Sequence, residues 1–530
     1  MKKRCFLLLA ALMGAAANVP AQPGLIARIH FLGGERIAAD PNHWAFTNEF
    51  ASPPARALEA HLLDKLARVP GVWFRSKIAA GSGDGAAQLR PLLDDLLSSE
   101  WIFEIRDAPA SPEYALAIRL NETRARLWSQ NLREVLEAWT KLSVQKTADG
   151  WRLKKHEPPD LIQFHRAAEW VVVDVGQEPL SLDQTLPPAA KVAAETNWLV
   201  ADLDWPRLAQ LFPKLKVFDL PRIHLAVAGR DQNLDFIGQL FLSAPLAPLG
   251  SWQLPTNVLR QPLISFTAAR GIGSWLARQS WLGPARLEPP PDQAFIWALA
   301  QIPFQTYAAV PVPDADAALA QLDRNLAADT RWESRFLHLP EVVMTNREIE
   351  FRNVPFVAPF VQAVRAANGQ FLFGGFFPNP PPSSPLPAGL LQELSRPGLV
   401  YYHWEVTGVR LGKAPHLQLL QLSQLLLMLT QHRQLDAQSP AFQWLNDIGP
   451  TLGITVTEIT QTGPAELTFK RRAPGGLTAV ELVALVNWIE APNFPGCDLR
   501  LPEPRRPRPH PPLSGGPARP AAASPAVQAK

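Results

Sequence analysis

The pattern of apolar and polar positions alternates between two periods along the chain. A period-two run, which is typical of a strand, occurs first at "ARIHFLG" (residues 27–33). Later runs of this kind are "WIFEIRD" (101–107), "EYALAIRL" (113–120), "WRLKK" (151–155) and "EWVVVDVG" (169–176). The runs at 101–107 and 113–120 are expected to pair as antiparallel strands.

Between these runs, apolar residues recur at the spacing of one helix face. Leu58, Leu62, Leu63 and Leu66 show this spacing in "RALEAHLLDKL". Further helices are predicted at "AQLRPLLDDLLSS" (87–99) and "RARLWSQNLREVLEAW" (124–139). Helices and strands are mixed without regular βαβ spacing. The sequence therefore favours an α+β fold, with mixed, mainly antiparallel sheets packed with helices.

A strand followed by a turn and a helix recurs in the later part of the chain. The four places are residues 197–212, 262–279, 293–326 and 398–431. Their spacing is irregular, so we interpret them as loosely recurring strand-turn-helix units and not as a counted repeat. The predicted α+β domains are an N-terminal one (22–190), a middle one (191–335) and a C-terminal one (336–499).

The first 21 residues have the layout of a secretory signal peptide. Lys2, Lys3 and Arg4 form a basic start, residues 6–17 are apolar, and Val19-Pro20-Ala21 suits signal peptidase. The apolar run is shorter than the roughly 20 residues that span a bilayer. We therefore expect cleavage near Ala21, a periplasmic or extracellular location, and no transmembrane segment in the mature chain.

The last residues, 500–530, form a proline-rich basic tail. Residues 501–530 contain nine prolines and almost nothing to bury, so the tail is predicted to be disordered with polyproline II character. Its basic charge is suited to an acidic surface or a cell-wall polymer. The simpler interpretation is a solvated chain end.

Charge and cysteine content exclude several classes. The chain has 51 basic and 48 acidic residues, and removal of three basic residues with the signal peptide leaves 48 of each. Binding to nucleic acid is therefore disfavoured. Only Cys497 remains, so no intrachain disulfide is possible. A small buried side chain is favoured for it over a nucleophile.

Gly271 and Gly273 follow a strand-like run and precede an apolar helical stretch, as in a dinucleotide-binding turn. That fingerprint needs a third glycine three residues later and an acidic residue about 20 residues on. Leu276 and Gln293 stand there instead. We therefore interpret the two glycines as residues of a tight turn.

Asp202 and Asp204 lie at the end of a predicted strand, where period two puts both on one face. They are candidates for metal binding or acid-base chemistry, but Asp204 is also well placed to cap the helix that holds Pro206. The pair Asp94 and Asp95 lies in a helical pattern and is expected on a solvated face.

The histidines are dispersed, and the HExxH metal motif is absent. His30, His224 and His403 fall in predicted strands, and the sequence leaves open whether they converge. Ser82 in "GSGDG" has no strand before it and is expected in a flexible loop. No catalytic, cofactor-binding or metal-binding residue is assigned, and no cofactor is predicted.

Tryptophan is frequent, with 17 Trp against 4 Tyr. Flat aromatic faces can stack on sugars, but packing between sheet and helices is the favoured interpretation. The residues concerned are Trp151, Trp170, Trp198, Trp252, Trp281, Trp332 and Trp404. The leucine-rich stretch 417–429 is predicted to be a buried helix.

Three stretches carry a family resemblance: "RIHFLGGERIAADPNHWAFTNEF", "PLISFTAARGIGSWL" and "QIPFQTYAAVPVPDA". In them the chain resembles a family of large uncharacterised exported bacterial proteins. The resemblance implies no known activity and carries over no site residue.

The sequence therefore favours a non-enzymatic, exported binding or structural protein of the cell envelope or periplasm. Its expected partner is an unknown protein or envelope ligand. The alternatives are an exported hydrolase, which requires Asp202, Asp204 and a histidine in one cleft, and a glycan-binding protein, which requires exposed tryptophans on one surface.

Overall fold

The structure, a computed structural model, describes most of the chain between residues 24 and 496. The described residues are 24–42, 51–73, 83–108, 111–154, 161–176, 182, 186, 196–259, 261–279, 285–300, 305–328, 341–345, 347–353, 358–377, 388–412 and 438–496.

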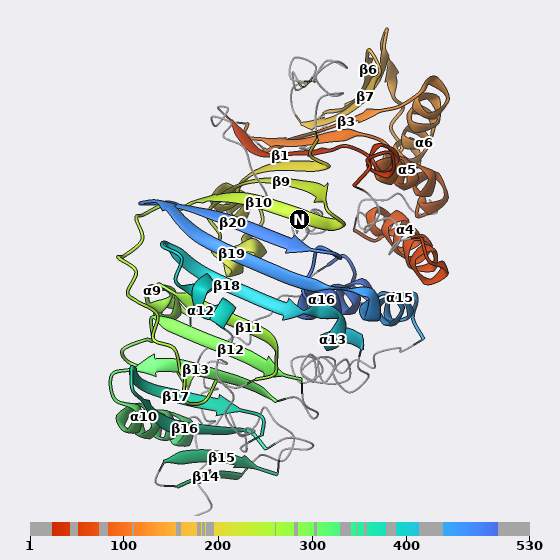
Figure 1. Cartoon of the computed structure of the whole chain (residues 1–530). Helices are drawn as coiled ribbons and strands as arrows, with labels where there is room; N and C mark the ends of the chain where they lie inside the picture. The colour runs from red at the N-terminus through yellow and green to blue at the C-terminus, as the bar shows by residue number, and fades with distance from the viewer. Residues whose placement is uncertain are drawn as a thin grey trace, which may run out of the picture.

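The strands of the described residues form one continuous sheet, in which every neighbouring pair is antiparallel (Figure 1). The strands follow one another from β6 and β7 at the top of Figure 1 to β14 and β15 at the bottom. The predicted α+β class is confirmed, with one large antiparallel sheet in place of several. In the described residues no helix is both long enough and apolar enough to cross a membrane.

The first ten strands in the chain occupy one half of the sheet. They are β1 (Leu25–Phe31), β2 (Trp101–Arg106), β3 (Glu113–Arg119), β4 (Gln145–Lys146), β5 (Gly150–Lys154), β6 (Leu161–Ala167), β7 (Trp170–Gly176), β8 (Leu199–Asp204), β9 (Arg222–Arg230) and β10 (Asn233–Phe241). From the outer edge inward their pairings give the order β4-β5-β6-β7-β3-β2-β1-β8-β9-β10. The predicted pairing of β2 with β3 is confirmed.

The next ten strands repeat this order in the other half. They are β11 (Leu263–Arg270), β12 (Gln293–Leu299), β13 (Thr306–Val312), β14 (Glu341–Met344), β15 (Glu348–Arg352), β16 (Phe360–Ala366), β17 (Gly369–Gly375), β18 (Leu399–Val406), β19 (Ile454–Gly463) and β20 (Glu466–Ala473). Their order is β14-β15-β16-β17-β13-β12-β11-β18-β19-β20. We call residues 25–241 the first unit and residues 263–473 the second unit.

Helices recur at the same places in both units. α2 (Gly34–Ala38) and α9 (Gly273–Arg278) follow the first strand of each unit, and α6 (Glu122–Thr140) and α10 (Ala315–Ala328) follow the third. α8 (Trp205–Leu211) and α13 (Thr407–Gly412) follow the eighth. The sequence indicated only loosely recurring strand-turn-helix units and no counted repeat, whereas the structure contains the same order of ten strands twice.

The two units meet where β10 pairs with β20. Ile237 is the fifth residue of β10 and Lys470 the fifth of β20, and these two residues are register partners. A pseudo-twofold axis therefore passes through this pair. The predicted domain boundaries near residues 190 and 335 lie outside the described residues and differ from the boundary between the units.

Connections of unequal length hide the repeat in the sequence. Residues 32–100 join β1 to β2 and contain α4 (Pro53–Trp73) and α5 (Ala86–Ser98), whereas residues 271–292 join β11 to β12. The stretch between β18 and β19 contains α15 (Pro440–Ile448) and η5 (Gly449–Thr451), where the first unit has only η2 (Pro213–Phe218) beyond α8.

Helices cover one face of the sheet, which we call the helical face. In the first unit, α5, α6 and α8 bury Leu92, Trp128 and Leu208 against strand residues such as Ile29 and Leu225. In the second unit, α10 packs on Ile349 and Leu372. α4 joins a cluster with α13, α15 and α16 (Ala479–Ile489), so a helix of the first unit packs on helices that follow strands of the second.

The other side, which we call the opposite face, differs between the units. In the second unit it carries a buried aromatic core, in which Trp297 and Tyr307 stack on Phe373 with ring centroids 5.7 and 5.4 Å apart. Residues 252–259 and α12 (Ala388–Leu394) pack on this core. The first unit has no matching aromatic cluster on this face among its described residues.

Candidate functional site

The glycine turn at residues 271–273 holds a carboxylate of the chain itself. Gly271 takes a φ of +74°, which confirms the predicted tight turn. The N–H groups of Gly271 and Gly273 donate to the Asp292 carboxylate at 3.3 and 3.2 Å. Because Asp292 occupies the donors that a phosphate would need, this turn is not a nucleotide cradle.

Asp202 and Asp204 have separate roles. Asp204 caps α8, and its Oδ1 accepts the N–H of Arg207 at 3.1 Å, which confirms the capping prediction. Asp202 is the register partner of His224 and contacts its Nδ1. The structure thus brings Asp202 and a histidine together, and leaves Asp204 outside this pair.

The three strand histidines do not converge. His30 contacts Glu100 at 2.8 Å, and both lie on the opposite face with the Asp202–His224 pair. His403 lies on the helical face of the second unit, where its Nδ1 is 2.8 Å from Thr267 Oγ1. Each described histidine lies within 4 Å of a carboxylate.

The prediction for Asp95 is wrong. Asp94 is exposed, but Asp95 is only 6% exposed. Its carboxylate accepts from Arg124 Nε at 2.8 Å and from Trp128 Nε1 at 2.7 Å. It therefore ties α5 to α6 beneath the sheet.

Most of the described tryptophans pack inside the molecule, as expected. Trp151, Trp170 and Trp198 are buried, and Trp252 and Trp404 are partly buried. Several other predicted features lie outside the described residues: the signal peptide (1–21), Ser82, Trp281, Trp332, the helix at 417–429, Cys497 and the tail (500–530).

Sequence reasoning missed a polar row that crosses the opposite face of the first unit. Register partners in successive strands form the row Glu104, Arg28, Asp202, His224 and Gln239. Paired residues of neighbouring strands share a face, so all five side chains lie on one side of the sheet. Period two indicates which residues share a strand face, but only the register brings these strands together.

The corresponding row of the second unit is largely aromatic. The register gives Trp297, Phe266, Trp404, Val456 and Arg472 in the same order across β12, β11, β18, β19 and β20. The same fold can therefore pack apolar residues at these positions, and the charges of the first unit are not a requirement of the backbone.

Burial of the charged and polar side chains of this row costs free energy of folding. Glu104 is 0% exposed and depends on ion pairs with Arg28 and Arg106, both at 2.8 Å. Replacing such a buried pair by packed apolar residues is often neutral or stabilising. His224 is 3% exposed, and in the part of the chain that the structure describes neither its Nε2 nor Gln239 Oε1 has a hydrogen-bond partner. A row with this cost is a candidate functional feature.

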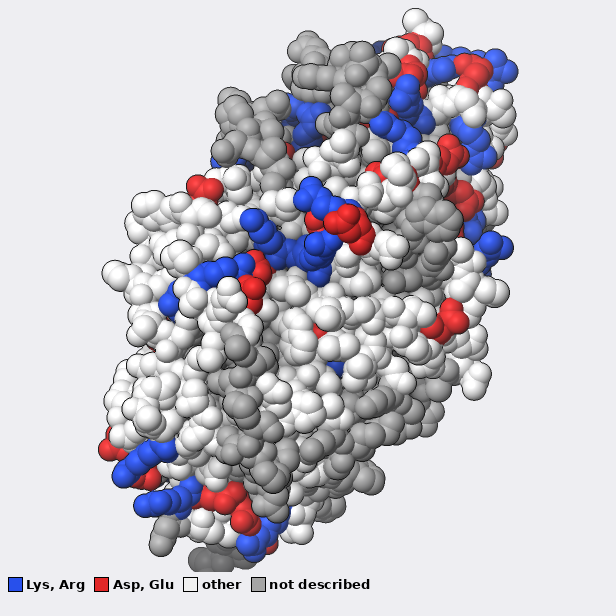
Figure 2. Space-filling view, viewed as in Figure 1, with Lys and Arg blue, Asp and Glu red and all other residues white. Residues whose placement is uncertain are grey.

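The polar row reaches the junction of the two units. We define the junction face as Arg222, His224, Ile237, Gln239, Thr468 and Lys470, which share the opposite face of β9, β10 and β20. Lys470 is exposed and Ile237 is 38% exposed. Figure 2 shows Lys and Arg side chains, with Asp and Glu side chains beside them, over the middle of the sheet, where β9, β10 and β20 lie.

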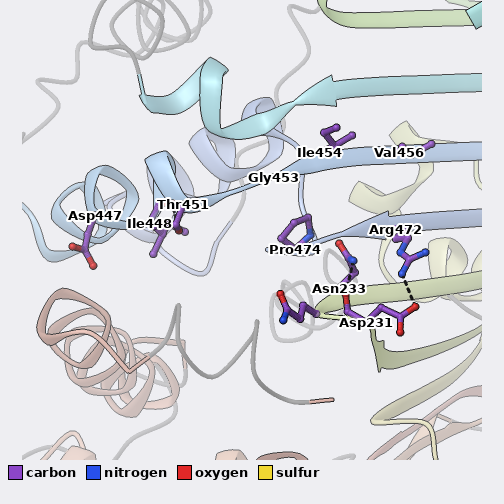
Figure 3. A pocket seen from close by; sticks show the side chains of 11 residues that line it. Asp231, Asn233, Asp447, Ile448, Thr451, Gly453, Ile454, Val456, Arg472 and Pro474 are labelled. Carbon is purple, nitrogen blue, oxygen red and sulfur yellow. Dashed lines mark hydrogen bonds and ion pairs between the residues drawn. The ribbon is translucent and has the colours of Figure 1, made fainter. Parts of the chain in front are cut away.

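A pocket of about 840 Å³ lies beside the junction face. It is bounded by the β9–β10 turn, the ends of β19 and β20, α15 and η5 (Figure 3). Val456 and Arg472 line it and are register partners on the opposite face, so the pocket continues the junction face. Ile454, Val456 and Pro474 give it an apolar floor, and Ile454 is 50% exposed.

Two carboxylates border the pocket. Asp231 pairs with Arg472 at 2.9 Å, and the Asn233 side chain donates to the Asp231 carbonyl at 3.0 Å. Asp447 on α15 lies at the other end of the labelled side chains in Figure 3. The pocket thus combines an apolar floor with a polar rim, as ligand pockets commonly do.

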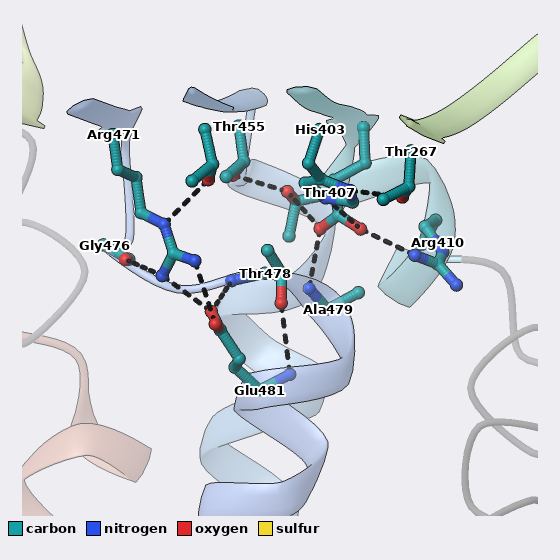
Figure 4. Close-up of polar contacts among 12 residues, drawn as sticks. Thr267, His403, Thr407, Arg410, Thr455, Arg471, Gly476, Thr478, Ala479 and Glu481 are labelled. Atoms are coloured by element: carbon teal, nitrogen blue, oxygen red, sulfur yellow. Dashed lines mark hydrogen bonds and ion pairs between the residues drawn. The ribbon is translucent and has the colours of Figure 1, made fainter. Parts of the chain in front are cut away.

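On the helical face, a buried carboxylate holds α16 against the second unit (Figure 4). Glu405 is 0% exposed and accepts from Thr407 Oγ1 at 2.8 Å, the Ala479 N–H at 2.7 Å and Arg410 Nη1 at 2.7 Å. Arg471, a residue of β20, donates to both carboxylate oxygens of Glu481 at the start of α16. This network fixes the backbone on which the junction face is built.

The polar row contains one carboxylate–histidine contact, between Asp202 and His224. Nothing in the described residues places three metal-binding side chains together. His224 contacts Asp202, but in the described part of the chain no hydroxyl or thiol lies within hydrogen-bond distance of the Nε2 atom of His224. No protein-family profile, curated protein or solved structure matches the chain.

The pH dependence of stability tests the Glu405 network. Burial would raise the pKa of Glu405, but the contacts with His403 and Arg410 outweigh burial and lower the pKa to about 2. Because this is below the ordinary 4.5, the ionised group stabilises the fold above pH 4.5, and this contribution is lost as the pH falls from 4.5 towards 2. We expect Glu405→Gln to cost about 3 kcal/mol at pH 7 and little near pH 2.

Urea unfolding followed by circular dichroism at pH 7, 4 and 3 measures this difference. Glu59→Gln, at an exposed position of α4, is the control and should stay within about 0.5 kcal/mol of wild type. A Glu405→Gln deficit that is equal at all three pH values would refute the assignment.

Proposed function

We propose that the chain is a non-enzymatic exported protein that binds a partner or ligand at the cell envelope through its junction face. One observation carries this proposal. Positions that pack aromatic residues in the second unit hold charged and hydrogen-bonding residues in the first unit. That difference weakens packing and leaves polar groups beside an open pocket, which is the expected compromise at a binding site.

The hydrolase alternative has less support. It required Asp202, Asp204 and a histidine in one cleft, and Asp204 instead caps α8. Asp202 and His224 remain as a pair without an adjacent nucleophile among the described residues. A pair of this kind orients an imidazole, which also serves to present a hydrogen-bond donor or acceptor to a ligand.

The glycan-binding alternative required two or three tryptophan faces on one surface. Among the tryptophan side chains that the structure describes, Trp275 is the most exposed, at 40%. The described residues that line the pocket include no aromatic side chain. A single exposed ring gives little stacking area for a polysaccharide.

Hydrolase screening tests the absence of catalysis. We expect wild type, Asp202→Asn and His224→Asn to give the same background with ester, peptide, glycoside and phosphoester substrates. His403→Asn is the matched control, because it removes a buried histidine from the helical face. An activity that is lost in His224→Asn and retained in a folded His403→Asn variant would overturn the proposal.

Export rests on the basic and apolar layout of residues 2–21. When the full chain is expressed in a bacterial host with an envelope, we expect intact mass to show loss of residues 1–21 in the exported fraction. Leu8→Arg interrupts the apolar run and should retain the uncleaved chain in the cell. Uncleaved wild type in the cytoplasm would contradict export.

A further inference from the structure

We propose that two copies of the chain pair along the outer edge of β14, so that the sheet of one copy continues into the sheet of the other. This inference goes beyond the proposed binding function, because β14 lies at the end of the sheet and not at the junction of the units (Figure 1). It follows from three properties of the edge: its unpaired backbone groups, its exposed apolar side chains, and its complementarity to itself.

The two ends of the sheet are equivalent hairpins. The β4–β5 hairpin ends the first unit, and the β14–β15 hairpin ends the second. In both, a threonine precedes a two-residue loop and its N–H donates across the turn. Thr147 donates to the Gly150 carbonyl at 3.1 Å, and Thr345 donates to the Glu348 carbonyl at 2.8 Å. Positions in the two hairpins therefore correspond one to one.

The bond across the second turn fixes which backbone groups of β14 point outward. In an antiparallel pair, residues alternate between those bonded to the neighbouring strand and those that point away from it. Thr345 is bonded across the turn, so Val343, two residues before it, is bonded to β15. The N–H and C=O groups of Val342 and Met344 therefore point away from β15, towards the edge.

In the first unit the corresponding edge is blocked. The bond of Thr147 sets the same alternation there, so the backbone groups of Val144 and Lys146 point outward. The Val144 N–H donates to Oε1 of Glu137, a residue of α6, at 3.0 Å. Lys146 is exposed and places a charge on the edge, which is a common protection against pairing with another chain.

The edge of the second unit lacks both protections. Val342 and Met344 stand at the corresponding positions, and among the described residues their outward backbone groups have no hydrogen-bond partner. Their side chains are 37% and 41% exposed. They are register partners of Phe351 and Ile349, which belong to the apolar cluster beneath α10. An edge of this kind is suited to adding a further strand.

The edge is complementary to a second copy of itself. A twofold axis through Val343, normal to the sheet, places Val342 opposite Met344 of the second copy, and Met344 opposite Val342 of that copy. Both residues of each pair point their backbone groups at one another, so each pair exchanges both of its N–H···O hydrogen bonds. The apolar side chains of the two pairs then cover one another on the helical face.

Charge and symmetry favour a second copy over an unrelated strand. In this register Glu341 lies opposite Thr345 of the second copy, so no like charges face each other, and the next ionisable residue of that copy is Arg347. The chain already uses this mode, since β10 and β20 join the two units about a pseudo-twofold axis. Pairing of residues 341–345 alone buries less than the roughly 1,000 Å² of a stable interface, so the dimer should be reversible.

Cysteine cross-linking tests the register. In the mature chain with Cys497→Ser, Val343→Cys places two thiols at a non-hydrogen-bonded pair, with Cα atoms about 4.5 Å apart. We expect a disulfide-linked dimer after mild oxidation. Val342→Cys should give little, because its own copy lies two residues along the partner strand, more than about 7 Å away. Lys146→Cys, at the blocked edge, is the matched control and should stay monomeric.

Sedimentation velocity at increasing protein concentration tests the reversible dimer. Val342→Pro removes an outward N–H without removing a bond to β15, and should weaken dimerisation about tenfold or more, because each dimer loses two hydrogen bonds. Val342→Lys, which adds a charge opposite Met344, should do the same. Lys146→Pro removes the outward N–H of β4 and should dimerise as wild type does. Circular dichroism confirms that each variant is folded.

Three outcomes overturn the inference. Wild type that stays monomeric at every concentration, with Val343→Cys not cross-linked, would leave β14 without a second copy. A dimer that persists unchanged in folded Val342→Pro and Val342→Lys would place the contact elsewhere. Cross-linking of Lys146→Cys as efficient as that of Val343→Cys would show random collision. None of these outcomes bears on the junction face, so the proposed binding function is tested separately.

Discussion

The antiparallel pairing of β10 with β20 is the interaction on which the rest of the structure depends. It joins two ten-strand units of the same strand order into one sheet, about an axis through Ile237 and Lys470. Hydrogen bonds along eight residue pairs remove two open sheet edges at once. α4 adds a second link, since it packs from the first unit onto helices of the second.

The repeat explains which residues are structural and which are available for function. The same backbone arrangement carries a charged row in the first unit and a largely aromatic row in the second. The fold therefore cannot require both kinds of row. The aromatic row around Trp297 and Phe266 packs the second unit. The row from Glu104 to Gln239 keeps buried charge in the first unit and ends beside the pocket, so the proposed binding surface combines both units.

Local physical chemistry allowed part of this to be predicted from the sequence. The alternation of apolar and polar residues predicted the strands β1, β2 and β3, and the 3.6-residue period predicted the helices α4, α5 and α6. The preference of aspartate for helix N-caps predicted the role of Asp204. The tight turn at Gly271 followed from backbone freedom. Each of these features depends on residues that are close in the chain.

Features that depend on distant residues were not predictable. Arg28 and Glu104 are 76 residues apart, and only strand register brings them together. Asp95 was expected in solvent because its helical pattern does not reveal that α6 lies over it. The ten-strand repeat was hidden because the connections differ in length and the two opposite faces have diverged in composition.

Cysteine cross-linking across the junction tests the central claim most directly. In a Cys497→Ser background, the pair Ile237→Cys and Lys470→Cys places two thiols at register partners on one face. The account predicts an intramolecular disulfide after mild oxidation, with little from Ile237→Cys and Arg471→Cys, because Arg471 points to the helical face. A disulfide in the second pair and none in the first would contradict the register that joins the two units.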